Sequence, residues 1–440
     1  MNRTAEITVR TPFGEAPPFK IDNIVKQGTV WGSKLCCATT AEISKEDTSG
    51  GASVGSVTIH STLYVDDCNR FNTNIDDVIV SHHRFLNFSN RKRAPLNGEK
   101  CVLLPINKKA HTAIPTLMIE NHIMKEVDKA TVLGDIFNNK GNNNDLIAAR
   151  AKSGKGIIVN MLAMCNEMSF GRFSIESLLL LYKTVFVQTL LYNSEAWTYI
   201  TDTNLTLLHT LQLRCLKRIV RTSSSTPNSF LLLEMGILPL EFEIHIRQLR
   251  FLHHIVTLTQ DDPVLNLYIQ QQQYPNARNW ANNIKHLRTI YTLPADNEIQ
   301  NLSREAWKRM VKSVVMKRAM VRLKKQCAKL KKTSQLQYDD DDNSFTHQKY
   351  LTKYASETAK VVLKLRSRSV NCLNNRGDKG SCRLCGVGME TQQHVVNCSK
   401  IAKDCQPLSL ATIYSEVPLN DDNVIEIVKR YNLFQNNLND

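Results

Sequence analysis

Four side chains near the C-terminus have the types and the spacing of a metal site. The segment SCRLCGVGMETQQHVVNCSK holds a Cys-x2-Cys-x8-His-x3-Cys array, made of Cys382, Cys385, His394 and Cys398. The first pair has the spacing of a turn that points two thiolates at one place, and the second pair lies one helical turn apart, on one face. Three thiolates and an imidazole suit a tetrahedral zinc ion with no open position, so the array predicts a structural zinc. The alternative is a set of free buried thiols.

The segment around this array is too short to bury a core, so a bound metal would supply most of its folding energy. Basic residues precede and enter the array: Arg366, Arg368, Arg376, Lys379 and Arg383. Their charge favours nucleic acid as a partner of the zinc module. A purely structural role, in which the metal holds the C-terminal region together, is the other interpretation.

A second candidate site is the acidic pair Asp66 and Asp67. The run SVTIHSTLYV before it alternates in polarity and carries β-branched and aromatic residues, which predicts a strand that ends at the two carboxylates. Adjacent acids at a tight turn can hold Mg²⁺, and in phosphoryl transfer two such ions bind the attacking and leaving oxygens. An Asp-Asp pair is also common in simple turns and helix N-caps, so the pair alone does not decide between these roles.

A basic amphipathic helix is predicted over residues 303–332. This stretch has twelve Lys or Arg residues and a single acid, Glu305, while its apolar residues repeat with a helical period. The charged face could follow a phosphate backbone, with contacts from these residues: Lys308, Lys312, Arg322, Lys325 and Lys329. The alternative is the solvated outer face of a packed helix.

The whole composition limits the class of protein that carries these sites. The chain has 440 residues, enough for two or three domains, and 56 Lys and Arg residues against 41 Asp and Glu give a formal charge of +15, which favours a polyanionic partner. The sequence has neither the apolar core of a secretory signal nor an apolar run long enough to span a membrane. We therefore expect a soluble intracellular protein, in which clustered cysteines bind metal and do not form disulfides.

The pattern of apolar residues predicts how these sites are distributed. Residues 1–125 mix short apolar runs with polar loops, whereas residues 145–260 are predicted to be almost entirely helical, with apolar positions at helical spacing. Residues 261–300 are rich in Gln, Asn and Pro and are predicted to form a loosely packed linker.

Several segments, in collinear order, resemble the reverse transcriptase of non-LTR retrotransposons. Ile24–Val30 is similar to the family's Gln-Gly segment, which implies that Gln27 and Gly28 lie beside the templating nucleotide. Tyr64–Asp67 resembles the Tyr-x-Asp-Asp catalytic turn, with the tyrosine at the nucleotide and the two carboxylates as Mg²⁺ ligands. Lys100 lies where the family has a lysine near the triphosphate.

The later segments continue this resemblance. Val132–Ile136 is similar to the hairpin that grips the primer end, and Leu191–Trp197 resembles the Leu-Tyr-Gly-x-Glu-x-Trp segment of the thumb, with Asn193 in the glycine position. The Cys382–Cys398 array is similar to the zinc module that often closes such proteins. The resemblance covers most of the chain, from about residue 20 to residue 400.

The resemblance implies an α+β fold with a partial right-hand polymerase palm, a mainly helical thumb and linker, and a small zinc module. The predicted regions are a partial palm over 1–125, a primer-grip-like hairpin over 126–140, a helical thumb over 141–260, a linker over 261–350 that contains the basic helix, a C-terminal region with the zinc module over 351–405, and a tail over 406–440. The implied activity is RNA-directed DNA synthesis with Mg²⁺ in a nuclear or cytoplasmic ribonucleoprotein, and the implied partners are an RNA template and a DNA primer or target.

One catalytic element of the family is missing from this pattern. Palm polymerases hold their metals with a further Asp on a strand before the Gln-Gly segment, and none of Glu6, Glu15 or Asp22 fits that position. The fingers that cover the nucleotide are missing as well. Because phosphoryl transfer depends on positioning and charge neutralisation, we expect this chain alone not to polymerise. The alternative is a catalytically inactive nucleic-acid-binding protein that uses the basic helix and the zinc module.

Overall fold

The chain combines helices with short strands, which confirms the predicted α+β class. The computed structural model describes the following residues: 2–24, 32–46, 50–109, 112–167, 173–334, 336, 338, 345–403, 405–414 and 421–438. The chain divides into a first unit, Met1–Gly141 with Thr259–Ala277, and a second unit, Asn142–Leu258 with Arg278–Asp440. Among the described residues, no helix is both long enough and apolar enough to cross a membrane.

The described strands all lie in the first unit and pair two by two. The antiparallel pairs are β1 (Asn2–Ile7) with β4 (Phe19–Ile24), β2 (Arg10–Thr11) with β3 (Gly14–Glu15), β5 (Ala52–Val54) with β6 (Val57–Ile59), β7 (Ser61–Tyr64) with β8 (Asp67–Arg70), β10 (Met118–Ile119) with β11 (His122–Ile123), and β13 (Lys129–Val132) with β14 (Asp135–Asn138). β9 (Val102–Leu103) pairs in parallel with β12 (Lys125–Glu126). Most of these strands are too short to bury many side chains, and the described residues form no sheet of three or more strands.

Two of these hairpins coincide with segments that the sequence analysis singled out. In β7–β8, Tyr64 pairs with Asp67, and the intervening turn places Val65 at a φ of 53°. In β13–β14, the two-residue loop Leu133–Gly134 has positive φ at both positions, 50° and 83°. Such a loop matches the right-handed twist of the strands it joins. A hairpin is therefore present over Lys129–Asn138, inside the region where we expected one.

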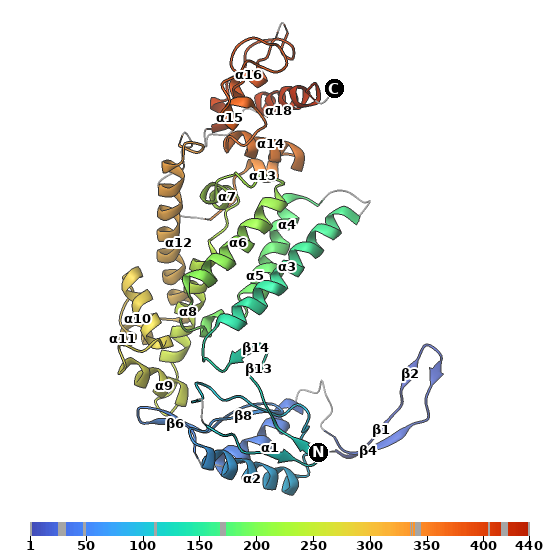
Figure 1. Cartoon of the computed structure of the whole chain (residues 1–440), viewed down its shortest axis with the longest axis vertical. Coiled ribbons are helices and arrows are strands. Elements are labelled where there is room, and N and C mark those ends of the chain that lie inside the picture. Colours follow the sequence, from blue (N-terminus) through green and yellow to red (C-terminus); the bar gives the residue numbers. More distant parts are fainter. Residues whose placement is uncertain are drawn as a thin grey trace. The chain divides into compact units, whose positions relative to one another are not determined.

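The described residues of the first unit also form three helices: α1 (Gly32–Glu46), α2 (Ile75–Lys92) and α9 (Pro263–Gln272). Asn74 caps α2, since its side chain accepts a hydrogen bond from the backbone N–H of Asp77, and two acids in the first turn of the helix suit its dipole. α9 comes much later in the sequence but packs on the β5–β6 hairpin (Figure 1), where the Gln270 side chain accepts a bond from Ser56 N–H.

The second unit is helical. Its elements are α3 (Asn144–Glu167), α4 (Ile175–Leu181), a π-helix (Tyr182–Phe186), α5 (Val187–Leu190), a 3-10 helix (Ser194–Ala196), α6 (Asp202–Ile219), α7 (Asn228–Glu234), α8 (Leu240–Val256), α10 (Trp280–Tyr291), α11 (Asp296–Gln300), α12 (Arg304–Lys329), α13 (Tyr350–Lys353), α14 (Ser356–Arg366), α15 (Leu373–Arg376), α16 (Gln392–Val396), α17 (Ala411–Tyr414) and α18 (Asp421–Asn436). The expected helical character of residues 145–260 agrees with these spans.

The core of the second unit surrounds α8, which packs against α6, α10, α11 and α12. α12 turns one buried side chain toward the interior at every fourth position: Trp307, Val311, Val315, Ala319, Leu323 and Cys327. The indole N–H of Trp307 donates to the Leu249 carbonyl at 2.7 Å, so the largest side chain of this stripe also leaves no buried donor unpaired. The predicted basic helix therefore has one side fixed in the core.

The predicted linker over residues 261–300 is instead folded. α9, α10 and α11 occupy most of it, and α10 buries Trp280, Ile284 and Leu287 at helical spacing. Asn279 caps α10 by accepting a hydrogen bond from Asn282 N–H. The Gln, Asn and Pro residues that suggested a loose connection serve as caps and exposed faces, while a few well-spaced apolar residues supply the packing.

The predicted tail over residues 406–440 also contains regular structure. α18 buries Val424, Ile427 and Phe434, and it packs on α14 and α16. Asp421 and Asp422 lie in its first turn, where their negative charges stabilise the helix through its dipole. The C-terminal segment is thus part of the framework that carries the cysteine-histidine array (Figure 1).

A buried ion pair joins α7 to α14 in the same unit. Arg366 donates to Glu234 through two atoms, from Nε to Oε2 at 2.8 Å and from Nη2 to Oε1 at 2.9 Å. Tyr350 donates its hydroxyl to Glu234 Oε2 at 2.7 Å, and Tyr338 donates to Oε1 at 3.0 Å. The remaining guanidinium nitrogen bonds the Ile413 carbonyl. Each carboxylate oxygen of Glu234 thus accepts two hydrogen bonds and each guanidinium nitrogen of Arg366 donates one, which makes the burial of the pair tolerable.

Candidate metal centre and basic helix

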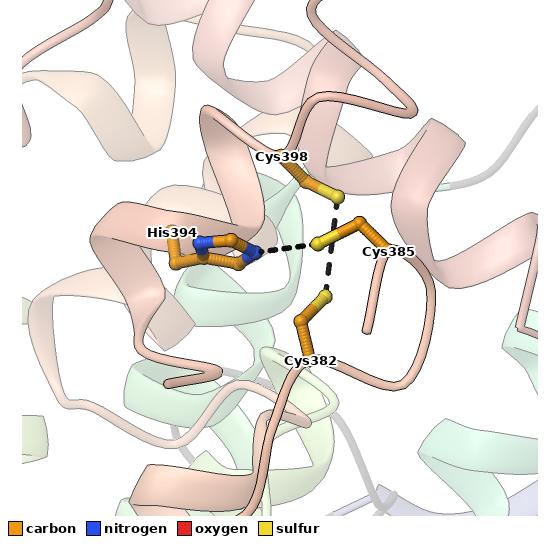
Figure 2. Close-up of side chains that lie close together, drawn as sticks. All are labelled: Cys382, Cys385, His394 and Cys398. Carbon is orange, nitrogen blue, oxygen red and sulfur yellow. Dashed lines mark hydrogen bonds between the residues drawn. The ribbon is translucent and has the colours of Figure 1, made fainter. Parts of the chain in front are cut away.

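The four predicted metal ligands converge in space (Figure 2). Cys382 Sγ lies 3.9 Å from Cys398 Sγ, and Cys385 Sγ lies 3.3 Å from His394 Nε2. All four ligand atoms lie within 4.8 Å of one another. A tetrahedral zinc ion with Zn–S bonds of about 2.3 Å needs sulfur–sulfur separations of about 3.8 Å. The set therefore fits a zinc ion, and four protein ligands fill its coordination shell.

A tight turn after the first cysteine positions Cys382 and Cys385. Gly386 N–H donates to the Cys382 carbonyl at 2.8 Å, and Val387 N–H points at Cys385 Sγ at 3.4 Å. Gly386 and Gly388 have φ values of 73° and 72°, a conformation that side chains with a Cβ rarely adopt. The glycines at these positions are thus required by the turn that aims both sulfurs at one place.

A short helix positions the other two ligands. Thr391 caps α16 by accepting a hydrogen bond from His394 N–H at 3.0 Å, which places the imidazole in the first turn. α16 ends at Val396, so Cys398 follows the helix and does not extend its face as the spacing suggested. The turn after the helix nevertheless brings its sulfur to the same place.

Glu390 anchors the turn that carries Cys382 and Cys385. Its carboxylate is fully buried and accepts hydrogen bonds from the backbone N–H groups of Arg383 and Leu373 and from the Arg383 guanidinium, the shortest at 2.6 Å. Burial alone would raise the pKa of Glu390, but these donors lower it below the usual range. Arg383 and Arg366, which we counted among basic residues facing a nucleic acid, are instead committed to Glu390 and Glu234.

Hydrogen bonding and burial act differently on the thiols of the array. Burial opposes ionisation of Cys385, but hydrogen bonds from Val387 N–H and from the neighbouring ligands lower its pKa to about 7. Burial raises the pKa of Cys398 to about 12. A bound divalent cation favours the thiolate form of each sulfur, since a coordinating thiol loses its proton.

The array is attached to the helices around it by polar contacts from α16. Gln392 donates to the Leu365 carbonyl at 3.1 Å and to the Tyr414 hydroxyl at 2.7 Å. Its side-chain oxygen accepts from Asn375 at 2.9 Å. Val395 and Val396 are buried beside these bonds. The metal ligands are therefore supported by a packed framework as well as by their own turn.

The acidic pair has a different environment. Asp66 lies in the β7–β8 turn and Asp67 begins β8, and both side chains are exposed, as is that of Tyr64. The Cys36 thiol and the Thr40 hydroxyl donate to the Val65 carbonyl and hold this turn against α1. Within the described part of the chain, no third Asp, Glu, His or Cys joins the pair in a metal-sized group.

The other site residues implied by the polymerase resemblance are Lys100, Gln27 and Gly28. Lys100 is exposed, and its backbone N–H donates to Asn97. Gln27 and Gly28 lie outside the described residues. A convergent magnesium site is therefore not supported among the residues that the structure describes.

The basic helix α12 has a mixed set of cations. Lys308 pairs with Glu305 at 2.8 Å, and Arg322 pairs with Glu241 at 2.7 Å while its guanidinium lies 4.2 Å from the centre of the Phe242 ring. These two predicted phosphate contacts thus have partners within the chain. The other three are exposed and have no carboxylate partner in the described part of the chain: Lys312, Lys325 and Lys329.

In the segment that resembles the thumb motif, the backbone conformation explains why the motif has a glycine where this chain has Asn193. Asn193 has φ 57° and ψ 22°, the left-handed region in which Gly and Asn are the most tolerated residues. The following residues form the 3-10 helix, and Trp197 is buried, with its carbonyl accepting from Gln248 at 2.7 Å. Asparagine at this position therefore preserves the turn.

Sequence reasoning missed the ion pair between Glu234 and Arg366. The only local signal is one acid within the apolar stretch from Phe230 to Leu238, and it does not identify a partner 132 residues away. It also missed Glu390 as the residue that anchors the cysteine turn.

In comparisons with known proteins, no family model matches this chain, and no curated protein matches it.

Proposed function

We propose that this chain is a nucleic-acid-binding protein derived from the reverse transcriptase of non-LTR retrotransposons. The observation that carries the binding proposal is that three of the predicted contacts on α12, Lys312, Lys325 and Lys329, are exposed and have no carboxylate partner among the described residues, in a chain with a formal charge of +15. Cations held on a helix that is fixed in the core can contact phosphates and release condensed counterions. The ancestry rests on the ordered motifs in the sequence, and it names an RNA template and a DNA primer or target as partners.

The zinc module has a supporting role in this proposal. Cys382, Cys385, His394 and Cys398 hold one zinc ion, which joins the cysteine turn to α16 and leaves no position open for a reacting group. Arg376 and Lys379 precede the cluster and are exposed, so they extend the basic surface of the C-terminal region.

Polymerisation by the chain alone is not part of the proposal. Asp66 and Asp67 supply at most two of the ligands that a two-metal site requires, and both are exposed at a hairpin turn. Lys100 is the residue that would lie near a triphosphate. Without a further carboxylate to fix the metals, in-line displacement loses the positioning on which its rate depends.

The binding proposal is tested by the salt dependence of affinity. We expect the log of the affinity for single-stranded RNA to fall linearly with the log of salt, and Lys325→Gln with Lys329→Gln to flatten the slope by about 1.4, since each neutralised phosphate of a single strand contributes about 0.7. Base preference should not change, because phosphate contacts carry no sequence information.

The matched control removes two exposed lysines from another helix, Lys152→Gln with Lys155→Gln on α3. It lowers the net charge equally and should leave the slope unchanged. An equal change in both double variants, or none in either, would return α12 to the role of a solvated face.

The catalytic part of the proposal is tested by primer extension on an RNA template with Mg²⁺. We expect no product from the chain alone. Extension that depends on Asp67 would overturn the inactive assignment and make Asp66 and Asp67 true metal ligands.

A further inference from the structure

A pocket of about 370 Å³ lies within the second unit, away from the cysteine-histidine array in sequence and in lining residues. Its walls come from the π-helix with α5, from the middle of α8, from α12 and from the loop before α8. The lining residues are Tyr182, Lys183, Val187, Gln188, Gly236, Ile237, Leu238, Glu243, Ile246, Arg250, Lys312, Met316 and Phe345. A volume of this size is within the range of small-ligand sites.

Four charged residues line the pocket. Lys183, Arg250 and Lys312 are exposed cations from three different helices, and Glu243 is a partly buried carboxylate of α8. Burial raises the pKa of Glu243 while the surrounding cations oppose that rise. In the described part of the chain, no hydrogen bond or ion pair joins this carboxylate to any of the three. Lining cations that make no ion pair with the acid of the pocket can bind a ligand anion.

The shape of the pocket is fixed by its backbone. The π-helix is a widened turn, a feature that often occurs at functional sites, and it carries Lys183. Tyr182 is held by a hydrogen bond from Gln212 to its hydroxyl at 2.8 Å. Gly236 has φ +60°, and a Cβ there would lie 2.3 Å from the backbone of Thr346, so the chain crosses directly over it. Ile246 and Met316 line the pocket beside these fixed parts.

We propose that this pocket binds one nucleotide, with its phosphate against Lys183, Arg250 and Lys312 and its base against the apolar wall beside Glu243. A carboxylate accepts two hydrogen bonds, which matches the adjacent N1–H and N2–H donors of guanine better than the edge of adenine or uracil. The inference deepens the proposed function, on which it rests for the ligand class. The nucleotide comes either from a free pool or from a single-stranded nucleic acid.

The first experiment titrates the full chain with GMP, AMP, guanosine and inorganic phosphate by calorimetry. We expect saturable binding of one GMP, with AMP, guanosine and phosphate each at least tenfold weaker. Lys183→Gln with Arg250→Gln should weaken GMP at least tenfold, because two charge-assisted contacts to phosphate are lost. Glu243→Gln should remove the preference for GMP over AMP.

The matched control is Lys317→Gln, an exposed cation of α12 that does not line the pocket. It should bind GMP like the unchanged protein. Pocket variants that bind GMP as well as Lys317→Gln does would overturn the proposal, and so would inorganic phosphate that binds as tightly as GMP.

The second experiment separates the two sources with short RNA strands that contain one guanine or none. Free GMP that competes with the guanine strand identifies a site open to both sources. If GMP does not bind but the guanine strand depends on Lys183, Arg250 and Glu243, the site takes its nucleotide from a strand, and the proposal stands. No dependence on these residues in either experiment overturns it.

Failure of the pocket proposal can be distinguished from failure of the proposed function. The salt slope set by Lys325 and Lys329 does not involve Lys183, Arg250 or Glu243. A chain that loses the pocket assignment but keeps the salt effect is still a nucleic-acid-binding protein.

Discussion

The two candidate metal sites differ in how their ligands are brought together. The ligands of the cysteine-histidine array come from a 17-residue stretch, and the thiols of Cys382 and Cys398 are buried. Asp66 and Asp67 are adjacent in sequence but exposed, and the described residues add no third ligand to them. A turn and one short helix can assemble four soft ligands locally. Two adjacent exposed carboxylates leave most of the octahedral shell of Mg²⁺ to water or to other groups.

The two sites also differ in how many hydrogen bonds support their backbone. Beneath the array, Glu390 binds two backbone N–H groups and Arg383, and Gln392 joins α16 to α14 and α17. The aspartate turn is held by two donors to one carbonyl, from Cys36 and Thr40. Ligands on a supported backbone can meet the geometry that a metal requires, whereas an exposed hairpin turn fixes only the backbone.

Removal of the metal ligands should have the largest effect. We expect purified protein to carry about one zinc per chain and Cys398→Ser to lose it, with loss of protection in the C-terminal region, since structural zinc in small modules binds with about 10 to 16 kcal/mol. Elemental analysis and hydrogen exchange over residues 382–398 measure the two effects.

The matched control is Cys405→Ser, which removes an exposed cysteine outside the array. It should retain the zinc. Protein without zinc above background, or equal zinc in both variants, would reduce the array to buried thiols and remove the contrast with the aspartate turn.

The next effect concerns the framework that carries the array. Glu234→Gln leaves the buried Arg366 without a counter-charge, so we expect the free energy of unfolding to fall by about 3 to 5 kcal/mol. Tryptophan fluorescence during denaturant unfolding follows the change, since three of the four tryptophans, Trp197, Trp280 and Trp307, lie in the second unit. Glu298→Gln, an exposed helical acid in the same unit, should cost less than about 0.5 kcal/mol. Equal losses in the two variants would mean that the buried pair is not a support.

A pH effect of intermediate size is expected in the same unit. Burial lowers the pKa of His245 to about 4. The charges of Arg322 and His286 also disfavour the protonated imidazole, while the carboxylate of Glu241 favours it and opposes part of the shift. The unfolded chain therefore binds a proton between about pH 6.5 and 4 that the folded chain does not. Stability should fall through this window as the pH is lowered, by up to about 3 kcal/mol from this residue.

The check is the denaturant midpoint measured from pH 7 to pH 4.5. His245→Gln should flatten its pH dependence, while His254→Gln, an exposed residue of the same helix, should not. A pH dependence that is identical in all three proteins would place the titrating group elsewhere.

The smallest effect is expected at the aspartate turn. Asp66→Asn and Asp67→Asn should each change the free energy of unfolding by no more than about 0.5 kcal/mol, because both side chains are exposed. Millimolar Mg²⁺ should not raise the melting temperature of either the unchanged or the double-substituted chain. A magnesium-dependent rise in melting temperature that disappears in the double variant would show that Asp66 and Asp67 bind a metal ion, and it would remove the contrast with the cysteine-histidine array.

The sequence by itself determined the features that depend on neighbouring residues. The spacing of Cys382, Cys385, His394 and Cys398 predicted a convergent array, and apolar periodicity predicted α6, α8 and α12. Alternation predicted strand structure before Asp66, although the single strand expected there is divided into β6 and β7, which pair in different hairpins. Each of these signals lies within one continuous stretch of fewer than about 30 residues. The α+β class follows from them, since it requires only the types of the elements and not their arrangement.

Only the tertiary structure decided which charged residues are free. Arg322, Arg366 and Arg383 look in sequence like other members of a basic surface, yet each is paired with a carboxylate, two of them 81 and 132 residues away. The pocket around Glu243 likewise combines the π-helix, α8 and α12, which are consecutive in no part of the sequence. Pairing and concavity depend on long-range packing, and local patterns carry no information about which distant helix supplies the partner.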